Sequence, residues 1–141
     1  MIKITCLGIE DAQLLITGAR KKANEIGVPM CIAVTDEAGN LIAFERMNGG
    51  KAHSIMVAQD KAFTAGSARK ATHEYNEVCI PGSLAFGIHT EAGGRMSVVG
   101  GGYPVKVGDE FVGGIGVSSG TPQQDMECAQ AGIDYFLATI T

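Results

Sequence analysis

The sequence predicts one α/β (α+β) domain over residues 1–141, with a five-stranded antiparallel sheet packed against helices. The length suffices to bury a single hydrophobic core. Apolar residues recur at helical spacing in three separate segments. Between these segments, short runs of strand-forming residues are joined by glycine-rich turns, as in β-hairpins. The expected order of elements is therefore α-β-β-α-(loop)-β-β-β-α.

Helical and strand patterns alternate in the first half of the chain. Thr5 can cap a first helix, whose end near Ile26 is marked by Gly27 and Pro29. Two short runs rich in strand formers flank an Asp-Glu-Ala-Gly-Asn turn and predict a hairpin. The expected elements are a helix over 5–26, strands over 30–34 and 41–47, and a helix over 51–68.

Residues 69–94 show little regularity apart from a short helix expected over Thr72–Asn76. Such a segment is typical of a mobile or ligand-covering loop. A three-stranded meander with glycine at each corner should follow, because short apolar runs alternate there with glycine-rich turns. Its strands are expected over 96–99, 103–107 and 111–118.

The last helix has the clearest start signal in the chain. Thr121 can be its N-cap, Pro122 occupies the favoured first position, and Gln124 completes a capping box. The strand before it contains three glycines, which leave little side chain on that part of the sheet. Glycines in this position indicate that another element packs very close to the backbone.

Composition and charge restrict the classes of partner. The net charge is −4 and the densest basic run is Arg20-Lys21-Lys22, so nucleic-acid binding is not expected. The first residues contain neither a signal sequence nor a long apolar stretch, so we expect a cytoplasmic protein without a membrane span. The four cysteines form no CxxC pair and are expected to be reduced and mostly buried. Since only 18% of the residues are charged, we expect a homo-oligomer that hides part of this surface.

The turn and helix after the second strand carry the densest set of polar and titratable groups. At 100° per residue, His53, Asp60 and Lys61 fall on one face of this helix. The turn before the helix holds Arg46 and Asn48. If the protein has a ligand site, we expect it here.

The opposite face of the same helix is expected to be its apolar face, and it includes Met56 and Phe63. Gln59 falls in the middle of this face. Because buried amides need hydrogen-bond partners, we expect Gln59 to bond an edge of the sheet or a neighbouring subunit.

A glycine run, a serine-containing stretch and the histidines each allow a structural and a functional interpretation. Gly100-Gly101-Gly102 lies between two expected strands rather than before a helix, which favours a structural hairpin over a phosphate loop. Ser118 and the next two residues precede the last helix, where a plain cap is favoured over an anion site. The three histidines lie in different segments, so no built-in zinc site is expected. A tetrapyrrole metal needs only one His, Met, Cys or Tyr as its ligand. For His53, a solvated or helix-capping role is favoured over a role as such a ligand.

Two groups of motifs make the chain similar to a known family. They are Ala33-Val34-Thr35-Asp36, Arg46-Met47-Asn48-Gly49 and Lys61-Ala62-Phe63-Thr64-Ala65, followed by Gly101-Gly102-Tyr103-Pro104-Val105, Val112 to Ser118, and Gln124-Asp125. In this order they resemble the GlcG/HbpS-like proteins, including the C-terminal domain of PduO-type proteins. The resemblance implies a profilin-like fold and oligomers. It also implies haem binding in some members and contexts of glycolate, glycerol and propanediol utilisation. The family's usual RMDGA has asparagine at position 48 here, which removes a carboxylate and puts any acid or metal role of that position in doubt.

The leading hypothesis is a non-catalytic protein that binds a small ligand, haem or another tetrapyrrole, as a sensor or carrier linked to glycolate, glycerol or propanediol-type catabolism. One alternative is an enzyme that holds a small anionic or aldehyde metabolite with Arg46, His53 and Lys61, although no GxSxG nucleophile elbow is present. Another is an assembly factor whose oligomeric surface is its function. The candidate ligand-binding residues are Arg46, Met47, Asn48, His53, Lys61, Gly101, Gly102 and Ser118.

Overall fold

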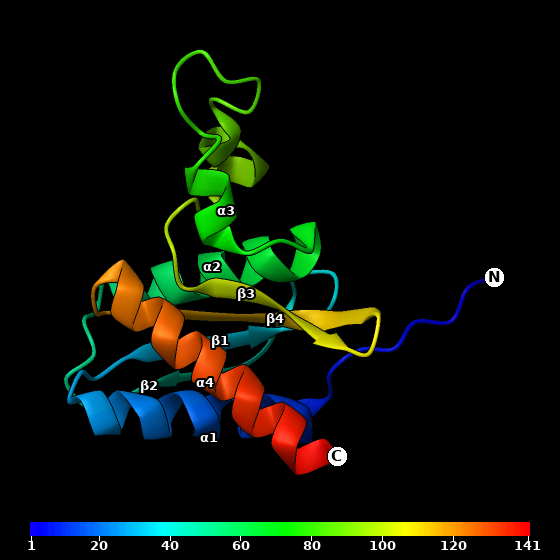
Figure 1. Cartoon of the computed structure of the whole chain (residues 1–141), viewed down its shortest axis with the longest axis vertical. Coiled ribbons are helices and arrows are strands. Elements are labelled where there is room, and N and C mark those ends of the chain that lie inside the picture. Colours follow the sequence, from blue (N-terminus) through cyan, green and yellow to red (C-terminus); the bar gives the residue numbers. More distant parts are fainter.

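The computed structural model describes all residues 1–141 and places a four-stranded antiparallel sheet between two helical layers (Figure 1). Its elements are α1 (Ile9–Ile26), β1 (Cys31–Thr35), β2 (Leu41–Arg46), α2 (Ser54–Ala68), α3 (Thr72–Asn76), β3 (Gly102–Val107), β4 (Glu110–Ser118) and α4 (Pro122–Ile140). The strands lie in the order β2-β1-β4-β3, so β2 and β3 are the two edges. α1 and α4 cover one face of the sheet, and α2 covers the other. None of the helices combines the length and apolar character needed to cross a bilayer.

Each face of the sheet has its own core. The larger core lies between the sheet and the layer of α1 and α4, and its large members include Leu15, Ile32, Val34, Ile115 and Phe136. The smaller core lies under α2 and consists of one cysteine and three alanines. Because these side chains are small, α2 lies close to the sheet.

The expected fifth strand is absent, and the prediction of a five-stranded sheet is wrong. Residues 96–99 form no strand, because threonine hydroxyls form hydrogen bonds with the backbone of this segment and of the residue before it. The Thr64 hydroxyl on α2 donates to the carbonyl of Arg95 at 3.1 Å and accepts from the amide of Ser97 at 2.9 Å. The Thr72 hydroxyl on α3 donates to the carbonyl of Val99 at 2.6 Å. The segment is therefore fastened to the helices, and the glycines after it lead into β3 without forming a hairpin.

α1 begins at Ile9 rather than at Thr5. The amide of Leu7 donates to the carbonyl of Val112 at 3.0 Å, so the chain before the helix is bonded to the sheet. The amide that precedes the helix, that of Gly8, is satisfied by the Asp11 carboxylate at 2.9 Å. Because the residues before α1 are hydrogen-bonded to β4, the helix starts later in the chain than the sequence alone predicts.

Other predicted elements are confirmed. The early hairpin is present as β1 and β2, which pair antiparallel, and the short helix over Thr72–Asn76 is present as α3. At the start of α4, the Thr121 hydroxyl accepts from the amide of Gln124 at 3.2 Å. The side chain of Gln124 accepts in turn from the amide of Thr121 at 3.0 Å, which completes the predicted capping box.

The predicted faces of α2 are wrong. Lys61, expected on the polar face, is only 1% exposed, whereas Met56, expected on the apolar face, is 63% exposed. The reason is the glycine-rich stretch of β4, where a Cβ on Gly116 would overlap the carbonyl oxygen of Ala58. α2 therefore rests on the sheet through its small residues. Gln59 is half-buried and donates to the carbonyl of residue 55 of its own helix at 3.0 Å, so the predicted bond to a sheet edge is wrong.

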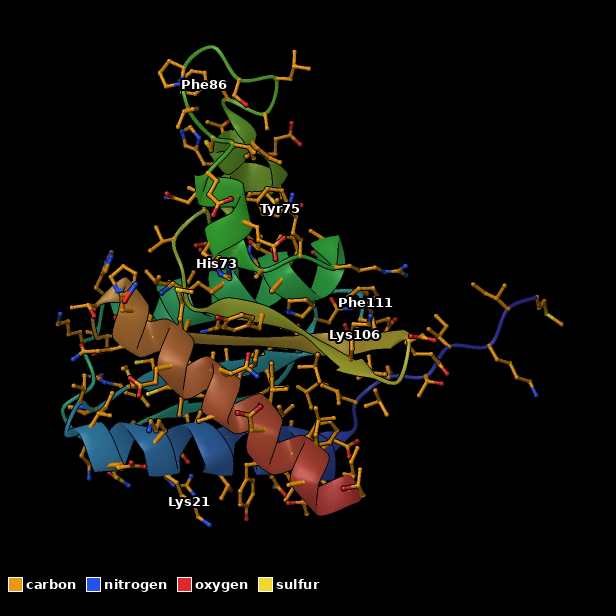
Figure 2. All side chains as sticks on the ribbon, viewed as in Figure 1. Lys21, His73, Tyr75, Phe86, Lys106 and Phe111 are labelled. Carbon is orange, nitrogen blue, oxygen red and sulfur yellow. The ribbon has the colours of Figure 1, made fainter.

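Residues 77–94, here called the arm, extend away from the body of the molecule beyond α3, at the end of the molecule where β3 lies (Figure 1). The arm contains only two short 3₁₀ helices, Ile88–Thr90 and Ala92–Gly94. Immediately after the arm, Arg95 forms an ion pair with Asp60 of α2 at 3.0 Å. Figure 2 shows Phe86 at the far end of the arm, distant from both cores.

Candidate functional site

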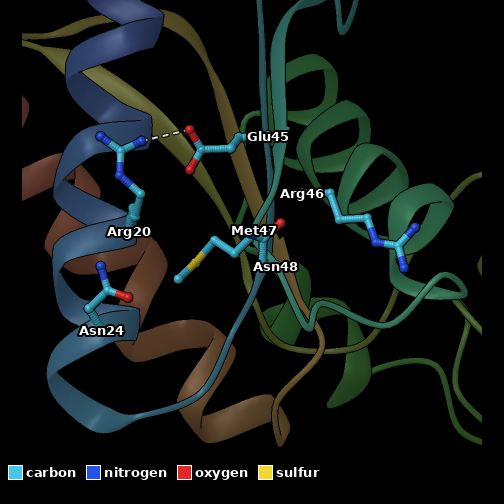
Figure 3. Close-up of a pocket in the computed structure, with 6 residues that line it drawn as sticks. All are labelled: Arg20, Asn24, Glu45, Arg46, Met47 and Asn48. Carbon is cyan, nitrogen blue, oxygen red and sulfur yellow. Dashed lines mark hydrogen bonds and ion pairs between the residues drawn. The ribbon is translucent and has the colours of Figure 1, made fainter.

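A hollow of about 460 Å³ lies between α1 and the end of β2, and we call it the α1–β2 hollow (Figure 3). Its lining residues are Arg20, Asn24, Glu45, Arg46, Met47 and Asn48. Alternation along β2 directs Glu45 and Met47 toward α1, whereas the side chain of Arg46 extends to the other face of the sheet. The hollow thus contains Arg46 and Asn48, the two turn residues at which the sequence predicted a ligand site.

The chemistry of this hollow is polar. Arg20 donates from Nη1 to Oε1 of Glu45 at 2.6 Å. The second carboxylate oxygen of Glu45 is enclosed and has no hydrogen-bond partner. Met47 is the only apolar lining residue. The hollow therefore suits a small polar ligand with hydrogen-bond donors better than a large apolar one.

The other face of β2 borders α2 and carries exposed apolar and basic groups. We call this the β2–α2 surface and define it by Leu41, Phe44, Arg46, His53 and Met56. Leu41 and Met56 are exposed and line one hollow of about 340 Å³, while Phe44 is half-buried against the smaller core. Arg46 donates from Nε to the carbonyl of residue 50 at 3.0 Å. His53 immediately precedes α2 and is exposed, and its side chain makes no hydrogen bond within the chain.

Lys61 lies in the interior, where it links α2 to β4 and α4. Its ammonium donates to Oδ2 of Asp125 at 2.9 Å and to the carbonyl of Val117 at 3.0 Å. The other oxygen of Asp125 accepts from the amide of Gly120 at 2.9 Å. Burial lowers the pKa of the Lys61 ammonium, and the neighbouring Asp125 carboxylate opposes this effect. This pair joins three elements and is closed to solvent.

Three further predicted residues surround this buried pair rather than a surface site. Gly101 has φ of 129°, and a Cβ there would come within 2.8 Å of Nζ of Lys61. A Cβ on Gly102 would come within 2.6 Å of the carbonyl oxygen of Lys61. Ser118 is buried and donates from its hydroxyl to that of Ser54 at 3.1 Å. These positions therefore let α2 pack tightly against the start of β3 and the end of β4.

The predicted site residues thus occupy three places. Arg46, Met47 and Asn48 lie at the end of β2, His53 lies at the start of α2, and the other four lie in the interior. Arg46, His53 and Lys61 do not converge on one ligand, because Lys61 is buried against Asp125. Sequence reasoning missed Arg20 and Glu45 because only the packing of α1 on β2 brings them together.

A cysteine and a histidine side chain lie in contact with each other on the arm. Sγ of Cys79 lies 3.1 Å from Nδ1 of His89. All four cysteines are free, and Cys31 and Cys128 are buried while the other two reach the surface to different degrees. No group of three or more His, Cys, Asp or Glu side chains is arranged to hold a metal ion.

Comparison with known proteins agrees with the motifs of this chain. Residues 7–134 match the family model described as "Haem degrading protein HbpS-like". An uncharacterised 15.0 kDa protein of the dhaT-dhaS intergenic region of Citrobacter freundii is 32% identical over 95% of this chain and 94% of its own length.

Two solved structures share the fold. The crystal structure of the Klebsiella pneumoniae protein ORFY superposes with a TM-score of 0.95 at 32% identity, covering 98% of this chain and 95% of ORFY. The crystal structure of a PduOC:haem complex superposes with a TM-score of 0.88 at 31% identity, covering 93% of this chain and 95% of that one. The resemblance that the motifs indicated is therefore confirmed, and the chain belongs to the HbpS-like family.

Proposed function

We propose that this protein binds haem or a related tetrapyrrole on the β2–α2 surface and acts as a carrier or sensor rather than as an enzyme. The observation that carries the proposal is the haem complex of a domain 31% identical to this chain, with a TM-score of 0.88. A link to glycolate, glycerol or propanediol-type catabolism is part of the proposal. It rests on the family resemblance that the motifs of this chain indicate.

The residues of the β2–α2 surface fit the chemistry of a haem. The macrocycle needs apolar contact, the iron needs an axial donor, and the propionates favour cations. Leu41 and Met56 expose apolar side chains, and His53 presents an imidazole without an intramolecular partner. Arg46 of this surface, and Lys51 in the adjacent turn before α2, form no ion pair with a carboxylate. Bound haem would supply a redox-active iron, while these residues would bind and orient it.

The α1–β2 hollow fits a tetrapyrrole less well. It is lined by charged and amide side chains, with Met47 as its only apolar residue. A flat apolar ring placed there would leave the Arg20 and Glu45 charges against hydrocarbon, which is unfavourable. We therefore assign the tetrapyrrole to the opposite face of β2.

A haemin titration of the purified apo-protein tests the proposal. We expect a saturable shift of the main visible band with one haem per subunit, and His53→Ala should weaken binding or change the band position. His89→Ala is the control, because it removes an exposed imidazole from the arm, away from the β2–α2 surface. A change in absorbance that is merely proportional to added haemin would refute haem binding. Equal effects of the two variants would remove His53 from the site.

A further inference from the structure

The hollow of about 340 Å³ beside α2 contains an ion pair between Arg95 and Asp60, and we call it the Arg95 hollow. The two charged residues come from segments 35 residues apart in the sequence. A volume of this size lies within the range of sites that hold small molecules. The side chains that line the hollow include those of Asn40, Leu41, Met56, Gln59, Asp60 and Arg95.

Contacts with α2 fix the position of the Arg95 guanidinium. The Thr64 hydroxyl donates to the carbonyl of Arg95 at 3.1 Å, which holds the backbone. Nε of Arg95 donates to Oδ1 of Asp60 at 3.0 Å, and Cζ lies 4.1 Å from the centroid of the Phe63 ring. Asp60, Phe63 and Thr64 are neighbours on the surface of one helix, because they are spaced three and four residues apart. The guanidinium is therefore pre-organised, and a ligand that binds it loses little affinity to side-chain ordering.

The same contacts leave hydrogen-bonding groups of the ion pair unused. Neither Nη group of Arg95 donates a hydrogen bond within the chain, and Oδ2 of Asp60 accepts none. Gln59 donates from Nε2 to its own helix, so its Oε1 is also free to accept. The side chains of Arg95 and Asp60 are 45% and 25% exposed, so a small ligand can reach both.

The charges of the hollow select the class of ligand. Arg95 and Asp60 carry opposite charges side by side, so a ligand with a single charge is attracted by one of them and repelled by the other. A zwitterion avoids this conflict, because its carboxylate can face the guanidinium while its ammonium faces the aspartate. In an α-amino acid the two groups are bonded to the same carbon, which suits two protein groups that are themselves in contact.

The apolar side chains of the hollow select the rest of the ligand. Leu41 and Met56 are exposed and line the same hollow as the ion pair. An aliphatic group packed against them would remove apolar surface from water. The ligand that meets both halves of the hollow therefore combines a zwitterionic head with an aliphatic side chain.

We infer that the Arg95 hollow binds a free α-amino acid with an aliphatic side chain. The carboxylate accepts from the two Nη groups of Arg95, a pairing in which both hydrogen bonds are charge-assisted. The ammonium donates to Oδ2 of Asp60 and to Oε1 of Gln59. This site goes beyond the proposed tetrapyrrole function and does not depend on it. Since Leu41 and Met56 also belong to the β2–α2 surface, a bound amino acid and a bound haem would compete for these side chains.

Calorimetric titration of the purified chain, free of haemin, tests the site with three probes. We expect saturable binding of L-leucine with one molecule per chain. L-leucinamide lacks the carboxylate, and 4-methylpentanoate lacks the ammonium. Each should bind about tenfold more weakly than leucine or worse, because each leaves one charged group of the hollow without its partner.

Variants of the ion pair should change this preference in opposite ways. Arg95→Gln should weaken leucine binding and abolish the preference for leucine over leucinamide. Asp60→Asn should weaken it and abolish the preference for leucine over 4-methylpentanoate. Both variants should remain folded, since an exposed ion pair contributes little to stability, and their melting temperatures without ligand check this. Arg69→Gln is the matched control, because its guanidinium also lies over a phenylalanine ring but does not line the hollow.

The outcomes separate this site from its alternatives. No saturable heat with leucine would overturn the inference, as would equal binding of leucine and 4-methylpentanoate, which would indicate a plain carboxylate site. If leucine gives no heat and Arg95→Gln instead weakens haemin binding, the free Nη groups serve a haem propionate and the inference is equally overturned. A chain that binds leucine but not haemin refutes the proposed function and leaves the amino-acid site intact.

Discussion

The buried pair of Lys61 and Asp125 allows a sharp test of how this fold is held together. Asp125→Asn preserves the shape of the side chain and its hydrogen bond from the amide of Gly120, but removes the charge that faces the Lys61 ammonium. An ammonium that loses its partner in the interior costs roughly 3–5 kcal/mol. We expect a loss of that order in the free energy of unfolding, measured by urea denaturation at matched protein concentrations.

A double-mutant cycle separates charge pairing from packing. Lys61→Met removes the ammonium and leaves the Asp125 carboxylate buried, so it should also be strongly destabilising. The double variant buries no charge, and its loss should be smaller than the sum of the single losses by about 2 kcal/mol or more. Asp60→Asn is the control, because its ion pair with Arg95 is more exposed and should contribute roughly 0–1 kcal/mol. If Asp125→Asn cost no more than this control, the assignment of a closed ion pair would be refuted.

The same pair predicts a dependence on pH. The pKa of Lys61 is lowered by burial, so at alkaline pH the unfolded chain holds more protons on this amine than the folded chain does. Stability attributable to this group therefore rises with pH, between the lowered folded pKa and the ordinary lysine pKa. Asp125→Asn removes the carboxylate that opposes the shift, so its deficit relative to the natural chain should shrink from about pH 7 to about pH 10.

Three further predictions concern packing, capping and thiol chemistry. Gly116→Ala should destabilise the protein by about 1–3 kcal/mol or more in urea denaturation, because its Cβ would overlap the backbone of Ala58; an unchanged midpoint would contradict the close packing of α2. Thr121→Ala should cost about 1 kcal/mol through loss of the N-cap of α4, measured as a lower melting temperature. Burial raises the pKa of the Cys31 thiol and raises that of the Cys128 thiol to about 11. After treatment of the folded protein with an alkylating reagent at about pH 8, mass spectrometry should therefore find both thiols unmodified. Rapid labelling would contradict their burial.

Local signals predicted the parts of the fold that depend on neighbouring residues. The capping box at Thr121 and Gln124, the β1–β2 hairpin and the short α3 are all present. Each depends on contacts within a few residues, so the sequence pattern contains nearly all of the information that determines it. The expected start of α1 at Thr5 and the expected strand over 96–99 are wrong because distant groups take those backbone bonds.

The candidate site was predicted only in part for the same reason. Spacing indicated Arg46 and Asn48 in one turn, but the ion pair of Arg20 with Glu45 joins segments 25 residues apart. Only the packing of α1 against β2 shows which side of the strand each residue faces. No periodicity within one element contains that information.

The sequence by itself determined the family, the order of most elements and the close approach of a helix to the glycines of β4. The tertiary structure decided which side of α2 faces that surface. A hydrophobic pattern assigns the apolar side of a helix to the core, but where glycines bring the helix very close, only small side chains fit beneath it. Lys61 is then buried because Asp125 satisfies its charge, and Met56 is left outside because the space beneath α2 is too small for it.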